Sequence, residues 1–222
     1  NRTAVFVLSC HAPYACGRSG VCCASGWDIP VDAAERLVIG NAVDRRLILP
    51  ARCEEDAGAP MAWSRDAPDL PSPGVAVLAR QASGDCVFLD RSATVRCLVQ
   101  AACGHHTMPM ACQQFPRVSM ADDRGLHVTL SHYCPSVADL LWRDDNRLVE
   151  VLEDPPGWRA SQLVAGLDAR GHWPPLLRPG VLFSHTGWTI WEHFCIATWA
   201  DARQPAASAL AVLWAAAEAL RG

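Results

Sequence analysis

Cysteine thiols are the side chains of this sequence with the most evident capacity for chemistry. The 222-residue chain has eleven of them, and such a density usually reflects either disulfide bonds or bound metal. The count is odd, no secretory signal is recognisable, and the adjacent pair Cys22-Cys23 cannot easily bridge itself. These features favour thiolate metal ligands in a reducing compartment. We therefore expect an intracellular, cytoplasmic metal-binding protein.

The cysteines fall into two blocks, separated by a stretch over residues 54–73 that is rich in Pro, Asp, Gly and Ala and that we expect to be a loop. The first block ends at Cys22-Cys23, shortly before Trp27, and the second block runs from Cys86 to Cys134. Thiolates that converge from several loops at about 2.3 Å from the metal are typical of zinc and iron–sulfur sites. The sequence therefore predicts irregular loops that a metal organises.

The order of these cysteines and their neighbours resembles the flagellin lysine-N-methylase (FliB) family and the YkgJ-type cysteine-cluster proteins, which are described as zinc- or iron-chelating. The resemblance covers roughly the first 140 residues, and its motifs specify neighbouring residues as well as cysteines. The segments that carry it are Phe6 to Trp27, Cys86-Val87-Phe88-Leu89, Cys97-Leu98-Val99-Gln100, Cys112-Gln113-Gln114-Phe115-Pro116-Arg117 and Cys134-Pro135.

The resemblance implies a metal centre, which is a 4Fe-4S iron–sulfur cluster or alternatively zinc. The eight cysteines that the family pattern assigns to it are Cys10, Cys16, Cys22, Cys23, Cys86, Cys97, Cys112 and Cys134. Eight thiolates exceed the four of one tetrahedral site. One four-iron cluster with cysteines left over, two metal sites, and a cluster accompanied by structural sulfurs therefore all remain open.

Three functions remain open as well. The resemblance implies an S-adenosylmethionine-dependent protein-lysine N-methyltransferase, whose partner would be a protein substrate carrying lysine. The alternatives are a non-catalytic metal-binding module used in sensing or assembly, and a fold with structural zinc whose surface binds a partner. The sequence lacks the Gly-rich turn with which ordinary methyltransferases hold S-adenosylmethionine. It also lacks the C-x3-C-x2-C run of radical S-adenosylmethionine enzymes. Any donor site would therefore be unconventional.

Charge and hydropathy exclude other partners. The formal net charge is −4, and the 19 basic residues, all of them arginine, are scattered along the chain. A nucleic-acid or anionic membrane surface would require clustered basic residues. No apolar run approaches the roughly 20 residues that a bilayer-spanning helix needs. We expect no nucleic acid and no membrane among the partners.

Several further residues could act as ligands or line a groove, although a structural role suits each of them better. A lone cysteine is usually a small buried hydrophobe, so we assign Cys103 and Cys195 to structure. The loop histidines His105-His106 and His132 lie near cysteines, but such histidines are more often solvent-exposed than metal-bound. The tryptophans between residues 188 and 199 and His193 could line a substrate groove, but their spacing also suits helix packing. The acidic pairs, which we read as solvated faces, are Asp122-Asp123 and Asp144-Asp145.

The elements that must position these residues are predicted to be mainly α-helical, with irregular cysteine-rich metal-binding loops and a small β-sheet from residues near Val5 and Val75. We expect a cysteine-cluster region over 1–140 and a helical C-terminal region over 141–222 that packs on it within one domain. Asp32 can cap a helix that Gly40 would end. The other segments with helical apolar spacing are 137–152, 163–167, 190–199 and 206–220.

Overall fold

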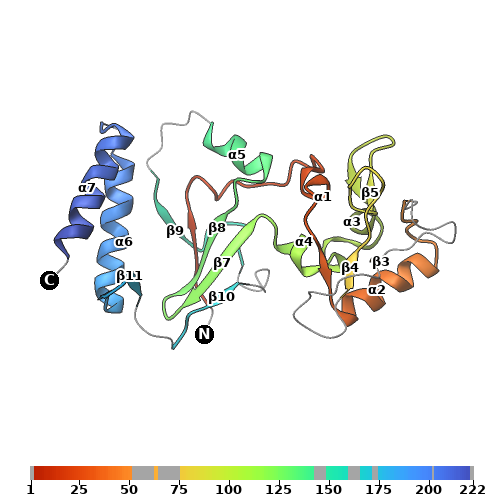
Figure 1. Ribbon diagram of the computed structural model, residues 1–222, viewed down its shortest axis with the longest axis horizontal. Coiled ribbons are helices and arrows are strands. Elements are labelled where there is room, and N and C mark those ends of the chain that lie inside the picture. The colour runs from red at the N-terminus through yellow and green to blue at the C-terminus, as the bar shows by residue number, and fades with distance from the viewer. Residues whose placement is uncertain are drawn as a thin grey trace. The chain divides into compact units, whose positions relative to one another are not determined.

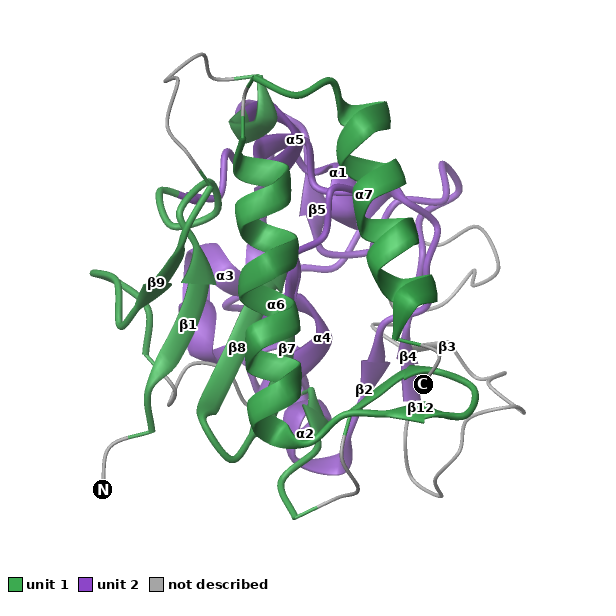
Figure 2. Cartoon of the chain, turned by 90° about the vertical axis from the view of Figure 1, so that its left-hand side faces the viewer, with its two compact units in different colours: residues 1–13, 119–129, 140–222 green, residues 14–118, 130–139 purple. Residues whose placement is uncertain are grey.

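The computed structural model describes residues 3–51, 63–64, 76–142, 149–159, 166–171, 175–201 and 203–220, with only the backbone described at 63–64. Figure 1 shows the order of the elements along the chain. The chain divides into two compact units (Figure 2). Unit 1 contains Asn1–Pro13, Ser119–Thr129 and Leu140–Gly222, and unit 2 contains Tyr14–Val118 and Leu130–Asp139. Each unit combines separate stretches of the chain, whereas the expected regions 1–140 and 141–222 are continuous. That the two regions form one domain stays a prediction.

A five-stranded mixed sheet lies mainly in unit 1 (Figure 1). Strand β1 runs parallel to the central strand β8 and antiparallel to the edge strand β9, and β10 runs parallel to β7 at the other edge. Side chains alternate between the two faces of a strand, and in β1 the buried residues are Val5 and Val7. In spatial order the strands are β10 (Leu167–Asp168), β7 (Arg117–Asp122), β8 (Gly125–Leu130), β1 (Val5–Leu8) and β9 (Val151–Glu153).

Unit 1 also contains two long helices, α6 (His185–Ala200) and α7 (Ala206–Ala219), which contact each other. The Ser184 hydroxyl caps α6 by accepting a hydrogen bond from the Gly187 N–H at 3.0 Å, as expected for an N-cap serine. A short antiparallel hairpin, β11 (Leu176–Arg178) and β12 (Val181–Leu182), precedes α6. The Arg178 guanidinium donates to Glu218 on α7 at 2.9 Å and so ties the hairpin to this helix.

Unit 2 is built from short elements around one hydrophobic core. The fully buried side chains at its centre are Val31, Ile39, Val87, Phe88 and Val99. The helices of this unit are α1 (Val21–Ala24), α2 (Ala33–Asp44), α3 (Leu98–Cys103), the 3-10 helix η1 (His105–Thr107), α4 (Met110–Gln114) and the start of α5 (Pro135–Leu141). Its strands are β2 (Pro30–Val31), β4 (Ala76–Leu78) and β3 (Trp63–Ser64) in one sheet, and β5 (Leu89–Asp90) and β6 (Arg96–Cys97) in another.

The prediction of a mainly helical fold was wrong, because the chain contains a five-stranded mixed sheet and three smaller sheets. The helix that begins at Pro135 ends at Leu141 instead of continuing to residue 152. Residues 151–153 form β9, where Leu152 pairs with Val7. Apolar residues at helical spacing do not reveal a strand whose partner lies about 145 positions away, and this pairing decides the structure here. Leu167 is likewise in a strand, and residues 163–165 lie outside the described residues.

Other element predictions are confirmed in part. Residues near Val5 and Val75 form strands, but these strands, β1 and β4, lie in separate sheets. Strand β1 and helices α6 and α7 form where the sequence predicted a strand and helices. Asp32 caps α2 by accepting from the Glu35 N–H at 2.8 Å, and the Glu35 carboxylate accepts from the Asp32 N–H at 3.0 Å, which completes a capping box. The predicted end at Gly40 was wrong, because the helix continues through Gly40 to Asp44. Within the part of the chain that the structure describes, no helix combines the length and apolarity needed to cross a membrane.

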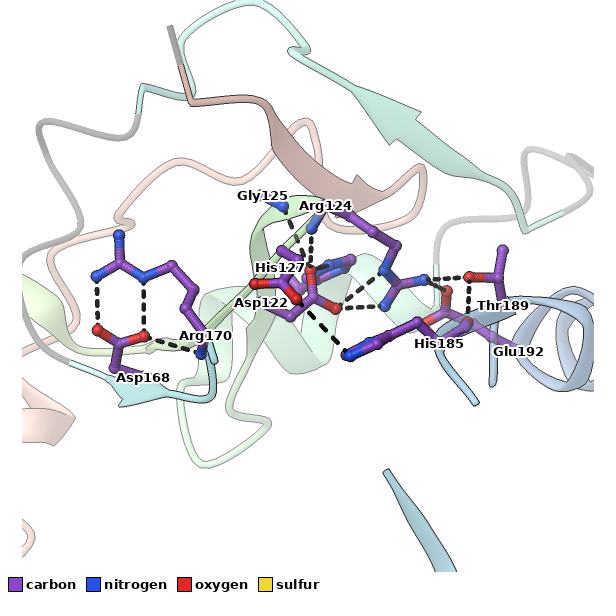
Figure 3. Close-up of polar contacts among 10 residues, drawn as sticks. Asp122, Arg124, Gly125, His127, Asp168, Arg170, His185, Thr189 and Glu192 are labelled. Carbon is purple, nitrogen blue, oxygen red and sulfur yellow. Dashed lines mark hydrogen bonds and ion pairs between the residues drawn. The ribbon is translucent and has the colours of Figure 1, made fainter. Parts of the chain in front are cut away.

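A polar network joins the β7–β8 turn of unit 1 to helix α6 (Figure 3). The Asp122 carboxylate accepts hydrogen bonds from the Arg124 guanidinium at 2.7 Å and lies 3.0 Å from His127 Nε2. Arg124 donates in turn to Glu192 on α6 at 2.7 Å. Burial alone would raise the pKa of Asp122, but the hydrogen bonds from Arg124 and His127 outweigh it and lower the pKa to about 2.

Asp122→Asn is predicted to lower the free energy of unfolding by about 2 kcal/mol at pH 7. A carboxyl whose pKa is depressed by folding stabilises the protein above its unfolded pKa, and this contribution is lost as the pH falls through the folded value. The difference between wild type and variant should therefore shrink between about pH 4 and pH 2. Urea unfolding at pH 7 and pH 3 measures it.

Asp168→Asn is the matched control, because Asp168 forms an exposed ion pair with Arg170 and such pairs contribute little. We expect a loss of less than about 0.5 kcal/mol. Equal losses in the two variants, or an Asp122→Asn effect that does not change with pH, would show that the network does not stabilise unit 1.

Candidate metal centre

Unit 2 contains a cavity of about 990 Å³ on which cysteines from distant parts of the sequence converge. Seven of the eight cysteines that the family pattern assigns to a metal line this cavity. They are Cys16, Cys22, Cys23, Cys86, Cys97, Cys112 and Cys134. No aspartate or glutamate is among the described residues of the lining. The donors available in the cavity are therefore dominated by sulfur.

Cys22 and Cys23 lie on the one-turn helix α1, with their Sγ atoms 3.9 Å apart. Two thiolates on one tetrahedral metal with bonds of about 2.3 Å stand about 3.8 Å apart, so this spacing suits a shared ion. Gly20 precedes the helix with φ of 72°, and a Cβ at this position would meet Val95 at 2.5 Å. The Trp27 indole donates to the Cys22 carbonyl at 2.6 Å and fixes the end of the segment.

Cys86 and Cys97 are positioned by backbone pairing and by buried neighbours. The Cys86 N–H donates to the Cys23 carbonyl at 2.7 Å, which joins the two cysteine blocks directly. Cys97 ends β6 and pairs with Leu89 of β5. Most of the apolar residues that follow these two cysteines in the motifs are buried. They are Val87, Phe88, Leu89 and Val99, and Leu98 is partly buried against the unit 2 core.

Cys112 is positioned by helix α4, whose first N–H group, that of Met110, donates to the Glu35 carboxylate. Glu35 also completes the capping box of α2, so one carboxylate fixes the N-termini of two helices. The Phe115 ring packs against Trp27 with centroids 5.2 Å apart. These contacts hold the α4 segment against the segment that carries Cys22 and Cys23.

The five thiols of Cys22, Cys23, Cys86, Cys97 and Cys112, here called the thiol group, influence one another's ionisation. Burial, followed by the neighbouring thiols, raises the pKa of Cys112. Burial also raises the pKa of Cys86, to about 11. The hydrogen bond from the Cys23 thiol lowers the pKa of Cys22, and the same bond raises the pKa of Cys23. Without metal the group thus favours one thiolate among neutral thiols, and metal binding must release protons.

Cys16 and Cys134 lie near Tyr14 and Arg117. The Tyr14 hydroxyl is 4.0 Å from Cys134 Sγ. The Arg117 guanidinium lies over the Tyr14 ring, 5.6 Å from its centroid, a cation–π arrangement. Burial, followed by the Cys134 charge, raises the pKa of Tyr14. Sequence reasoning missed Tyr14, although Arg117 was part of a quoted motif.

Three other cysteines do not line the cavity. Cys10 follows β1 and belongs to unit 1, so its assignment to the metal stays a prediction. Cys195 lies in α6 of unit 1. Cys103 ends α3 and packs against the unit 2 core, which agrees with the structural role expected of it. Cys53 lies outside the described residues.

The histidines and acidic pairs take different places. His105 lines the cavity, whereas His106 and His132 are not among its lining residues. Asp122 belongs to the network of unit 1, and the pair Asp144-Asp145 lies outside the described residues.

The α6 aromatic residues pack mainly on one another and on the preceding loop. Phe183 contacts Trp188 and Trp191, and Trp191 also contacts Phe194. Trp199 remains 47% exposed, and His193 is exposed as well. The ring contacts support packing as the main role of this segment.

The donor chemistry of the cavity fits a thiophilic metal, although no described group of three or more His, Cys, Asp or Glu side chains already has the geometry of a metal site. No protein-family model matches the chain, and searches of curated proteins and of solved structures find no significant match. The case for a metal centre therefore rests on the cysteine arrangement itself.

Alkylation of the metal-free protein tests the Cys22–Cys23 hydrogen bond. The thiolate is the reactive form, and a pKa below the ordinary value of about 8.5 increases its fraction at pH 7. We expect Cys22 to react with iodoacetamide about ten-fold faster than Cys112 at this pH. Peptide mapping by mass spectrometry measures both rates.

Cys23→Ala should slow the alkylation of Cys22, because it removes the thiol that is hydrogen-bonded to Cys22, whereas Cys103→Ala should leave the rate unchanged. Equal Cys22 rates in these two variants would show that Cys23 does not activate its neighbour.

Proposed function

We propose that unit 2 is a metal-binding module in which cysteine thiolates hold an iron–sulfur cluster, with zinc as the alternative metal. The observation that carries this proposal is the convergence of seven cysteine side chains on one cavity whose described lining has no carboxylate. Soft thiolate donors select zinc, copper(I) and iron–sulfur centres over hard cations. A reducing compartment such as the cytoplasm would keep the thiols available.

The thiol group supplies the ligands in this proposal. Its five members lie in the same cavity and affect one another's pKa values, whereas Cys16 and Cys134 adjoin Tyr14. The spacing of Cys22 and Cys23 suits two ligands of one ion. A four-iron cluster takes one thiolate at each iron, so it would draw its four ligands from separate positions of the group. The bound metal would link α1, β6 and α4 to one another.

Methyl transfer from S-adenosylmethionine to a protein lysine is a second proposal, supported by the motif resemblance and by the size of the cavity, which exceeds the needs of a metal centre. Such chemistry needs a neutral amine, and no carboxylate of the described lining can accept its proton. Equilibrium dialysis of S-adenosylmethionine against anaerobically purified protein separates the two functions. A stoichiometric donor site supports the enzyme, and its absence leaves the binding module.

Metal analysis of cysteine variants tests the metal centre directly. Cys22→Ala, Cys23→Ala and Cys112→Ala should each lose most of the metal that wild type retains after anaerobic purification. Their thiols lie on backbone that is fixed by Trp27, by the Cys86–Cys23 hydrogen bond and by Glu35. Elemental analysis and the visible absorbance of thiolate-bound iron measure the loss, and a colourless zinc-loaded protein would indicate the alternative metal.

Cys103→Ala and Cys195→Ala are the matched controls and should keep the metal, because neither thiol lines the cavity. Full retention in the first three variants would refute the assignment of the thiol group. Loss in either control would show that ligands outside this group are needed.

A further inference from the structure

The cavity is larger than a metal centre requires. Its volume of about 990 Å³ lies at the upper end of the range of small-molecule sites, roughly 300–1,000 Å³. The thiol group takes up one part of the lining. The remainder includes aromatic and apolar side chains as well as polar ones, among them Tyr14, Met108, Phe115 and Arg117. This mixture of apolar walls with a few polar groups is typical of a ligand site.

The charged side chains of the described lining are arginines, and they are Arg18, Arg96 and Arg117. They do not contribute equally. Arg18 and Arg96 are exposed. Arg117 is half-buried, and it is the guanidinium that lies against the ring of a second lining residue. A half-buried charge acts more strongly on a ligand than an exposed one, because it is less screened by water.

Arg117 and Tyr14 lie together in one part of the cavity lining. The guanidinium lies over the Tyr14 ring at 5.6 Å. A guanidinium and a phenol together offer several hydrogen-bond donors. Arginine in particular matches the two oxygens of a carboxylate or phosphate.

We propose that this part of the cavity is a binding subsite for a small oxyanion, the carboxylate or phosphate group of an organic molecule, which Arg117 binds with Tyr14 as a further donor. This proposal depends on the proposed function in one respect only, which is that the neighbouring thiols form a metal centre. An acid group held here would place the rest of the ligand along the apolar lining. A ligand presenting only a cationic group would be repelled.

Isothermal titration of the full-length, metal-loaded protein with inorganic phosphate and with succinate tests the subsite. Both anions should bind saturably, and the tighter one identifies the acid group. Arg117→Gln should weaken binding about ten-fold or more, the loss expected for a charge-assisted hydrogen bond. Arg117→Lys keeps the charge and should retain binding within a few-fold of wild type, which separates lost recognition from lost folding.

Arg91→Gln is the matched control, because Arg91 pairs with Asp85 in the same unit and does not line the cavity. Unchanged binding in this variant supports the subsite, and equal weakening in Arg117→Gln and Arg91→Gln overturns it. Absence of saturable anion binding to wild type also overturns it. Metal content is measured in every sample. Anion binding that depends on Arg117 in protein that retains no metal supports the subsite and contradicts the metal centre. Full metal content without anion binding supports the metal centre and contradicts the subsite.

Discussion

The hydrophobic core of unit 2 determines where the cysteine thiols lie, because the residues next to them in sequence are the ones buried in it. Val87 and Phe88 follow Cys86, Val99 lies two positions after Cys97, and all three are almost completely buried. A cysteine side chain is short, so its sulfur can move little once the backbone is fixed. The core thus fixes the cysteine backbone around one cavity, which leaves a metal fewer degrees of freedom to order when it draws the sulfur atoms together.

Burial favours the neutral form of the cavity thiols, whereas an arginine side chain stays cationic in proteins. Burial disfavours the thiolate and raises the pKa values of Cys86 and Cys112, so the metal-free cavity holds mostly neutral sulfur. A bound metal reverses this preference, because it stabilises thiolates directly. The half-buried Arg117 keeps its charge in every case. The same cavity can therefore hold a thiolate centre at one part of its lining and attract an anion at another.

The sequence predicted the features of the site that depend on residues close together in the chain. It missed the contacts between residues that are far apart in the chain. The motif neighbours of Cys86, Cys97 and Cys112 indicated that these cysteines belong together, and the structure places them in one cavity. Strand β9 was predicted as helix because its partner β1 lies at the other end of the chain. The contact between Tyr14 and Arg117 joins residues 103 positions apart, and no periodicity or spacing rule reports such a pair.

The central claim, that thiolates of unit 2 are the ligands of a bound metal, is tested most directly by X-ray absorption spectroscopy of anaerobically purified protein at the edge of the metal it retains. The account predicts a first coordination shell made of sulfur at about 2.3 Å, with a further iron shell if the centre is a cluster. A first shell of nitrogen and oxygen at about 2.0–2.1 Å would contradict it, because the metal would then be held by groups other than the cysteines of this cavity.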